Sequence, residues 1–168
     1  MSMQWFTWPL LGAAAIAAAD QAIKIVVLAV QPHVTVVPGF FAISVAANPG
    51  AAFSLFRQFP RMLTVLGILI LAALVGYLWE TAGSATRFEL TALSLLLGGA
   101  VGNLIDRLRL GYVVDYLDVF IGKYHWPTFN LADSALSIGV ACLAFLALRR
   151  HRTPGSTGAG VASRPGGP

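Results

Sequence analysis

Four long apolar stretches, separated by short polar segments, dominate the pattern of this chain. They cover about residues 8–30, 62–79, 88–107 and 129–148. A helix of about 20 apolar residues crosses the hydrocarbon core of a bilayer, so each stretch predicts a membrane-spanning helix. The second is an unbroken apolar run that ends in Tyr77 and Trp79, two residue types typical of membrane interfaces. We therefore expect an all-α membrane bundle of four transmembrane helices.

The segment between the first two stretches, about residues 31–60, has a different pattern. Its short runs of Val, Phe and Ile are broken by Pro-Gly and by Asn-Pro-Gly. Such runs and breaks predict short strands joined by turns, and hence a small β-layer. After the second turn, Phe53, Leu55 and Phe56 predict an amphipathic segment that lies on the bilayer or closes over a groove.

The composition agrees with a membrane protein, because only 11% of the residues are charged, against about 25% in an ordinary soluble domain. No Lys or Arg precedes the first apolar stretch, which continues beyond Asp20 and Lys24. We therefore expect it to be retained as a helix and not removed as a signal peptide. Residues 1–150 predict a single domain. Residues 151–168, rich in Gly, Pro and Ser, predict a disordered cytoplasmic tail.

Basic residues give the expected orientation. Arg149, Arg150 and Arg152 follow the fourth stretch, and an even number of crossings places both termini on one side. The positive-inside rule makes that side cytoplasmic, although the two sides carry similar numbers of basic residues in total. The net charge of +4 suits ordinary anchors to membrane lipids and does not indicate nucleic-acid binding.

Five of the seven acidic residues are aspartates that gather at one end of the bundle. Asp20 lies in the first stretch, Asp106 ends the third, Asp115 and Asp118 follow it, and Asp133 opens the fourth. A carboxylate in or near hydrocarbon is costly, so these positions indicate function. Asp118 is expected at the water boundary, whereas Asp115 has the more apolar neighbours.

Three spacings suggest local contacts. Asp20 and Lys24, at i and i+4, predict an ion pair that neutralises both charges. Asn103, Asp106 and Arg107 share a helix face and predict a supporting polar network. Asn130 and Asp133 also share a face, with Asp133 expected four or five residues inside the fourth span. A helix-capping role for Asp133 is an alternative.

Two glycines of the third stretch, Gly98 and Gly102, are four residues apart. This spacing lets another helix approach closely.

The sequence lacks the residue patterns that thiol or metal chemistry would need. The single cysteine, Cys142, lies within the fourth stretch, where a thiolate would be poorly solvated, and it predicts packing. The three histidines have no metal-ligand spacing. We therefore expect neither a metal nor another cofactor, and the carboxylates remain as the candidate reactive groups.

Five blocks of sequence carry a resemblance to a known family. They are Asp20-Gln21 with Lys24, Asn48 to Ser54, Gly98 to Asn103 with Asp106-Arg107, Val113 to Tyr116 with Asp118, and Phe129-Asn130 with Ala132-Asp133. In these blocks the chain resembles the lipoprotein signal peptidases, or signal peptidase II, over about residues 8–148. The resemblance implies a four-helix membrane bundle with a β-cradle and a short interfacial helix on the outer face.

The resemblance also implies an activity. The family consists of bacterial inner-membrane aspartyl endopeptidases that cut diacylglyceryl-modified prolipoproteins before the lipidated cysteine. By position, the catalytic pair is Asp115 and Asp133, in a protein expected to act as a monomer with its site near the outer face. The residues expected to bind substrate or support the site are Asp20, Lys24, Asn48, Gly50, Asn103, Asp106, Arg107 and Asn130.

Two positions depart from the family pattern. Pro49 stands where a small polar residue such as Thr is expected, and it lacks a backbone N–H for the local turn. Tyr116 stands where Phe is common.

Physical chemistry suits such a pair. Two close carboxylates share a proton and titrate together. The ionised member can take a proton from water while the protonated member donates a hydrogen bond to the scissile carbonyl.

Two alternatives remain at this stage. A small transporter or ion-conducting bundle would use membrane carboxylates as a proton relay, but it commonly shows internal repeats and broken helices near mid-membrane. No convincing repeat is present here, and the polar residues gather at one end. A non-catalytic assembly factor would explain the small-residue helix contacts but would leave Asp115 and Asp133 without a role.

Overall fold

A computed structural model describes residues 4–50 and 58–151 of the chain. Both the amphipathic segment predicted around Phe53 and the tail predicted beyond residue 151 lie outside these described residues. In chain order the elements are α1 (Gln4–Val30), β1 (His33–Val37), β2 (Phe41–Asn48), α2 (Pro60–Thr81), α3 (Arg87–Leu110), β3 (Val113–Ile121), β4 (Tyr124–His125) and α4 (Leu131–His151).

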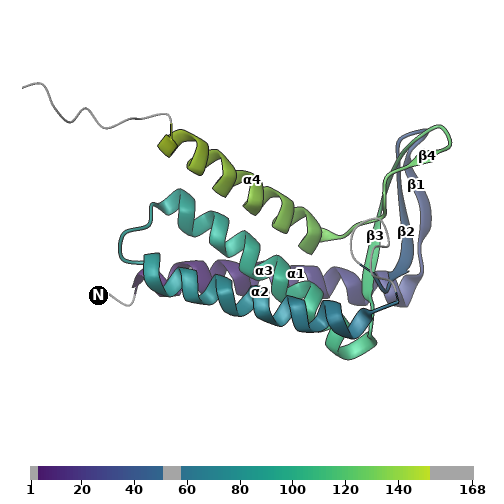
Figure 1. Cartoon of the computed structure of the whole chain (residues 1–168). Coiled ribbons are helices and arrows are strands. Elements are labelled where there is room, and N and C mark those ends of the chain that lie inside the picture. Colours follow the sequence, from purple (N-terminus) through teal and green to yellow (C-terminus); the bar gives the residue numbers. More distant parts are fainter. Residues whose placement is uncertain (1–3, 51–57, 152–168) are drawn as a thin grey trace, which may run out of the picture.

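The four helices form a bundle, with a small sheet standing across one end of it (Figure 1). Each helix is long and apolar enough to cross a membrane, which confirms the four predicted spans. The N-terminus and the end of α4 both lie at the end of the bundle opposite the sheet (Figure 1).

The predicted start of the fourth span was wrong by two residues. α4 begins at Leu131, so Asp133 is its third residue and lies in the first turn. The expected depth of four or five residues came from counting Phe129 as helical. Instead, Phe129 pairs with Leu117 of β3 in an isolated β-bridge.

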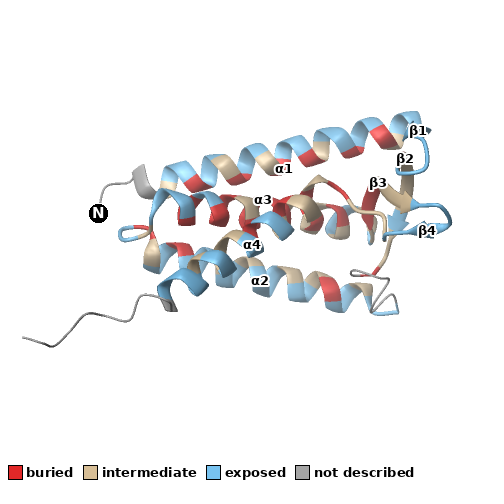
Figure 2. Ribbon diagram, turned by 90° about the horizontal axis from the view of Figure 1, so that it is seen from above, coloured by how far each residue is buried: buried red, intermediate tan, exposed pale blue. Residues whose placement is uncertain are grey.

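α3 is the central helix and contacts the other three. In its most apolar window 61% of the residues are buried, against 28% in α1, 11% in α2 and 17% in α4. Figure 2 shows buried positions along α3 and exposed positions on the outer sides of the other helices. The outward apolar side chains of α1, α2 and α4 are therefore the surface that meets lipid.

Glycines on α3 set how closely the helices approach. A Cβ on Gly98 would lie 2.7 Å from Cβ of Ile16 and 2.8 Å from the carbonyl oxygen of Ala13, both on α1. A Cβ on Gly102 would lie 2.7 Å from Oδ2 of Asp20 and 3.2 Å from Cβ of Ala132. The close approach predicted from this spacing is confirmed, and Gly102 contacts both α1 and α4.

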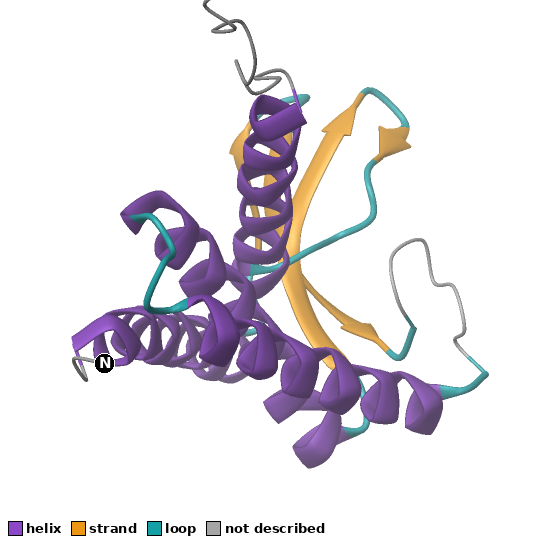
Figure 3. Ribbon diagram, turned by 60° about the vertical axis from the view of Figure 1, so that its left-hand side comes forward, coloured by secondary structure: helices purple, strands orange, loops and turns teal. Residues whose placement is uncertain are grey.

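The sheet contains four antiparallel strands in the order β1-β2-β3-β4. Figure 3 shows it as a curved layer beside the helix ends. The short strands predicted for about residues 31–60 are confirmed as β1 and β2, and the sheet also contains β3 and β4, which follow α3. β3 pairs with β2 so that Val113 lies opposite Asn48 and Asp115 opposite Ala46.

At the end of the bundle opposite the sheet, a buried carboxylate joins two helices. Thr86 and Glu89 form a capping box at the start of α3. Both carboxylate oxygens of Glu89 lie 3.0 Å from Nη2 of Arg150, near the end of α4. This contact fastens α4 to α3 at the end opposite the sheet.

The packing at Gly98 yields a first prediction. Gly98→Ala should lower the free energy of unfolding by about 1–3 kcal/mol, since the added methyl has no room against α1. Gly76→Ala in α2 is the matched control, because a Cβ there meets nothing within 4 Å and alanine favours a helix. Thermal unfolding of both variants in detergent tests this. A Gly98→Ala protein as stable as Gly76→Ala would contradict it.

Candidate functional site

The polar groups at the sheet end of the bundle are organised around one buried lysine. Nζ of Lys24 lies 2.8 Å from Oδ2 of Asp20 and 2.8 Å from Oδ2 of Asp106. It also donates to Oδ1 of Asn103 at 3.2 Å. The exposed fractions of Asp20, Lys24 and Asp106 are 0%, 2% and 1%. The predicted ion pair of Asp20 with Lys24 is confirmed, and Asp106 joins it.

The two aspartates of this triplet also bind main chain of other elements. Oδ1 of Asp20 accepts from the amide of Ala132 at 3.0 Å, at the start of α4. Oδ2 of Asp106 accepts from the amide of Val114 at 3.0 Å, on β3. The triplet therefore joins α1, α3, α4 and β3, which are the elements that carry the remaining polar residues.

Gln21 belongs to this network, although the expected site residues did not include it. Its Nε2 donates to Oδ1 of Asp106 at 3.0 Å and to the carbonyl oxygen of Gly102 at 3.1 Å. Its Oε1 accepts from Arg109 at 3.3 Å. The available signal was its place in an apolar stretch directly after Asp20.

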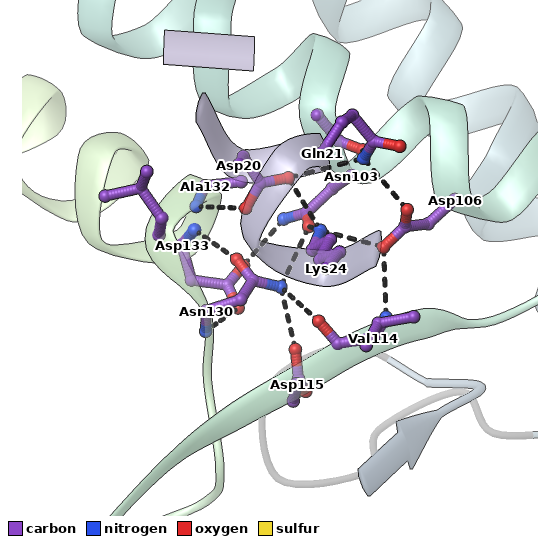
Figure 4. A network of polar contacts seen from close by, with 12 residues as sticks. Asp20, Gln21, Lys24, Asn103, Asp106, Val114, Asp115, Asn130, Ala132 and Asp133 are labelled. Atoms are coloured by element: carbon purple, nitrogen blue, oxygen red, sulfur yellow. Dashed lines mark hydrogen bonds and ion pairs between the residues drawn. The ribbon is translucent and has the colours of Figure 1, made fainter. Parts of the chain in front are cut away.

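Two asparagines connect the triplet to Asp115 and Asp133 (Figure 4). Nδ2 of Asn130 donates to Oδ1 of Asp115 at 2.8 Å and to Oδ1 of Asn103 at 3.1 Å. Nδ2 of Asn103 donates to Oδ1 of Asp133 at 2.7 Å. Because Asn103 also accepts from Lys24, the orientation of its amide is fixed, with the nitrogen toward Asp133.

Asn130 and Asp133 bind each other across the first turn of α4. The amide of Asp133 donates to Oδ1 of Asn130 at 2.8 Å, and the amide of Asn130 donates to Oδ2 of Asp133 at 3.3 Å. This reciprocal pair is a capping box, so the capping alternative for Asp133 holds alongside its contact with Asn103. One asparagine thus contacts both carboxylates of interest.

Asp115 lies deeper than Asp133. Its second oxygen, Oδ2, accepts from Nδ2 of Asn48 at 2.9 Å, at the end of β2. Only 1% of Asp115 is exposed, whereas Asp133 is half-buried. Within the described ranges, every buried side-chain nitrogen or oxygen has a hydrogen-bond partner.

Burial, and after it the neighbouring charge of Asp133, raises the pKa of Asp115 to about 7. Hydrogen bonds from Asn48 and Asn130 and the charge of Lys24 act in the opposite direction. Desolvation favours the neutral form of a carboxyl group, and so does a second carboxylate nearby. Asp115 therefore retains a proton at a pH where an exposed aspartate is ionised.

A groove of about 550 Å³ opens beside these groups. Its walls come from the end of β2, from the segment before α4 and from α4 itself, and they include Arg107 and Asp133. Asp115 does not line it. The lining residues are Asn48, Gly50, Arg107, Val113, Trp126, Pro127, Thr128, Phe129, Asp133, Ser134, Leu136, Ser137 and Ile138.

The turn at Pro49 is closed by a side chain. The amide of Gly50 donates to Oδ1 of Asn48 at 3.0 Å, and Nη2 of Arg107 donates to the carbonyl oxygen of Gly50 at 3.4 Å. The missing N–H of Pro49 therefore leaves no gap in this turn. Asn48 uses its oxygen for the turn and its nitrogen for Asp115.

The structure brings together every residue that the sequence marked for the site. Asp118, by contrast, pairs with Nδ1 of His125 at 2.9 Å on the hairpin of β3 and β4. Cys142 is half-buried in α4 and does not line the groove. In residues 4–50 and 58–151, no group of three or more His, Cys, Asp or Glu side chains could hold a metal ion.

Comparisons with known proteins agree on one family. A family model described as signal peptidase (SPase) II matches residues 12–149. The chain is 44% identical over 138 residues to the lipoprotein signal peptidase of Geobacter metallireducens, covering 79% of this chain and 85% of that protein. It is 45% identical over 139 residues to the one from Paraburkholderia phymatum, covering 79% and 82%.

Solved structures give the same result for the fold. A bacterial membrane enzyme determined by the in meso method at 2.3 Å resolution superposes with a TM-score of 0.80 at 32% identity, covering 91% of this chain and 94% of that one. A second such enzyme, at 1.9 Å resolution, gives a TM-score of 0.74 at 34% identity, covering 85% and 94%.

The triplet yields a second prediction. Lys24→Met should lower the free energy of unfolding by about 3–5 kcal/mol, because it leaves two buried carboxylates without their counter-ion. Lys123→Met is the matched control, since Lys123 is exposed near Tyr124. Thermal unfolding in detergent measures both. If the two variants were equally stable, the charge of Lys24 would not be needed to stabilise the two buried carboxylates.

Proposed function

The chain belongs to the signal peptidase II family, and from this premise we propose that Asp115 and Asp133 are its two catalytic carboxylates. The protein is an aspartic endopeptidase of a bacterial membrane that removes signal peptides from lipoproteins. This assignment replaces the transporter and assembly-factor alternatives.

The observation that carries the proposed pair is the shared contact with Asn130. Its side chain donates to Asp115, and its main chain donates to Asp133. Carboxylates from β3 and α4 are thereby held in one constellation, and the charge of one raises the pKa of the other. A pair of this kind holds one proton between its members near neutral pH.

The proposed chemistry follows from that single shared proton. The ionised carboxylate takes a proton from a water molecule, whose oxygen attacks the scissile carbonyl carbon. The protonated carboxylate donates to the carbonyl oxygen, which gives a tetrahedral gem-diol. The intermediate collapses when the C–N bond breaks, and the amine leaves with a proton returned from the pair. Asp133 lines the groove, and Asp115 is the member whose raised pKa keeps the proton.

The course of the groove supports a substrate that enters the membrane. Its lining includes residues 126–129, before α4, and Ser134, Ser137 and Ile138 within the spanning helix. A prolipoprotein has a cleaved bond close to the bilayer surface and a signal helix within it. We therefore propose a diacylglyceryl-modified prolipoprotein as substrate, cut before the lipidated cysteine.

The orientation is part of the same proposal. Arg149 and Arg150 lie in the last turn of α4, on the side of the bundle opposite the sheet (Figure 1). We place both termini in the cytoplasm, and the sheet outside as a cradle over the active site. Residues 1–150 then form one peptidase domain. All the proposed site residues come from a single chain, which supports a functional monomer.

Substitution of the carboxylates tests the proposed pair. Asp115→Asn and Asp133→Asn should each lower the cleavage rate by about 10³-fold or more, since either change removes the proton exchange that the mechanism needs. Purified protein is incubated with a diacylglyceryl-modified prolipoprotein, and the size shift is followed on a gel. Asp118→Asn and Cys142→Ala are controls that should retain cleavage. Retained cleavage by either Asp115→Asn or Asp133→Asn would refute the pair.

The pH dependence gives a further prediction. We expect kcat/KM to fall as the pH rises above about 7, where Asp115 loses its proton. The hydrogen bond from Asn48 lowers the pKa of Asp115, so Asn48→Ala should raise this pKa and move the alkaline limb to higher pH. Ser44→Ala on the same strand, whose hydroxyl pairs with His33, should leave the limb in place. A limb that moves to lower pH in Asn48→Ala would contradict the assigned proton.

A further inference from the structure

We propose that the hydroxyl of Tyr116 is a positioning group that fixes the start of α4, and with it Asp133, relative to Asp115. This inference rests on the proposed catalytic roles of these two aspartates. It assigns a task to the one atom that distinguishes a tyrosine from a phenylalanine.

The first amides of a helix have no partner within the helix. At the start of α4, three such amides bind side chains from three different segments. Leu131 donates to the Tyr116 hydroxyl at 3.2 Å, Ala132 to Asp20 at 3.0 Å and Asp133 to Asn130 at 2.8 Å. The helix end that carries Asp133 is thus located by three acceptors, and the acceptor on β3 is Tyr116.

The contact joins two residues that are close in sequence to the two aspartates. Tyr116 directly follows Asp115 on β3, and Leu131 lies two residues before Asp133. The amides of Tyr116 and Leu117 also donate to the carbonyl oxygen of Phe129, at 3.0 and 2.8 Å. The main chain therefore joins β3 to the segment just before α4, and the Tyr116 hydroxyl extends this connection into the first turn of the helix.

The ring of Tyr116 is itself held in place. It is 4% exposed and packs in a buried cluster with Val27 and Val114. Burial raises the pKa of Tyr116 to about 12, so the hydroxyl stays neutral through the working range of the enzyme. A neutral oxygen at the end of a rigid, packed ring accepts from Leu131 without adding charge beside the aspartates.

The hydroxyl can therefore be removed without changing any charge in the site. Removal of Asp20 or Asn130, by contrast, would alter charge or a direct contact with a carboxylate. Tyr116→Phe keeps the ring and deletes only the acceptor. The start of α4 then loses one of its two acceptors on other elements, and Asp133 can shift from the geometry needed with Asp115.

The first experiment measures kcat and KM of the full-length Tyr116→Phe enzyme in detergent with a diacylglyceryl-modified prolipoprotein. We expect kcat to fall by about tenfold, with KM within about twofold of wild type, because small misplacements of a catalytic group act on the chemical step. The expected result is a partial loss and not inactivation, because Asp20 and Asn130 still accept from the first turn of α4.

Tyr112→Phe is the matched control. Tyr112 borders the same buried cluster, and within residues 4–50 and 58–151 its hydroxyl takes part in no hydrogen bond. Tyr112→Phe should retain both kcat and KM. If kcat fell in both variants, the loss would be a general effect of removing a tyrosine hydroxyl near this cluster. That result would overturn the inference.

A second measurement separates positioning from unfolding. Thermal unfolding of Tyr116→Phe in detergent should show a protein that is folded at the assay temperature, so that its lower kcat reports the geometry of the site.

Three results would overturn the inference. These are wild-type kcat in Tyr116→Phe, equal losses of kcat in Tyr116→Phe and Tyr112→Phe, or a Tyr116→Phe protein that is unfolded at the assay temperature. Failure of the proposed function looks different, because Asp115→Asn or Asp133→Asn would then still cleave. The two proposals are therefore tested separately on the same substrate.

Discussion

A single buried ammonium group holds the active end of this bundle together. Lys24 neutralises Asp20 and Asp106 at 2.8 Å each, and these two aspartates also accept from main-chain amides of α4 and β3. Buried charges are tolerated only when paired and hydrogen-bonded, so the three side chains depend on one another. The strand with Asp115 and the helix with Asp133 are both attached to this triplet. The geometry of the proposed pair therefore depends on an ion cluster that does not itself line the groove.

Amide side chains connect this triplet to Asp115 and Asp133. Asn103 is oriented by Lys24 and donates to Asp133, while Asn130 donates to Asp115. A carboxamide contains both a donor and an acceptor, so hydrogen-bonded asparagines can fix the orientation of one another without adding charge. The asparagines therefore fix the positions of the two aspartates and add no charge of their own.

Much of this arrangement follows from sequence pattern. Length and hydropathy predict the four spans, and the glycine at position 98 predicts a close helix contact. The spacing of Asp20 and Lys24 predicts their pairing. The strand at Val113–Ile121 could not be predicted in this way, since its pairing with β2 is a contact between distant segments and its two aspartates interrupt the apolar alternation. The two roles of Asn130 also depend on three-dimensional proximity, because its partners lie on α3, β3 and α4.

The attachment of α4 at both of its ends has a consequence for the enzyme in its membrane. The helix is bound to α3 through Asn103 at one end and through Glu89 at the other, while only 17% of its most apolar window is buried. Bilayers differ in thickness, and a single helix meets such differences by tilting. A helix fastened at two points cannot tilt alone, so the bundle must tilt as one body. The active site is in this way insulated from the thickness of the bilayer that surrounds it.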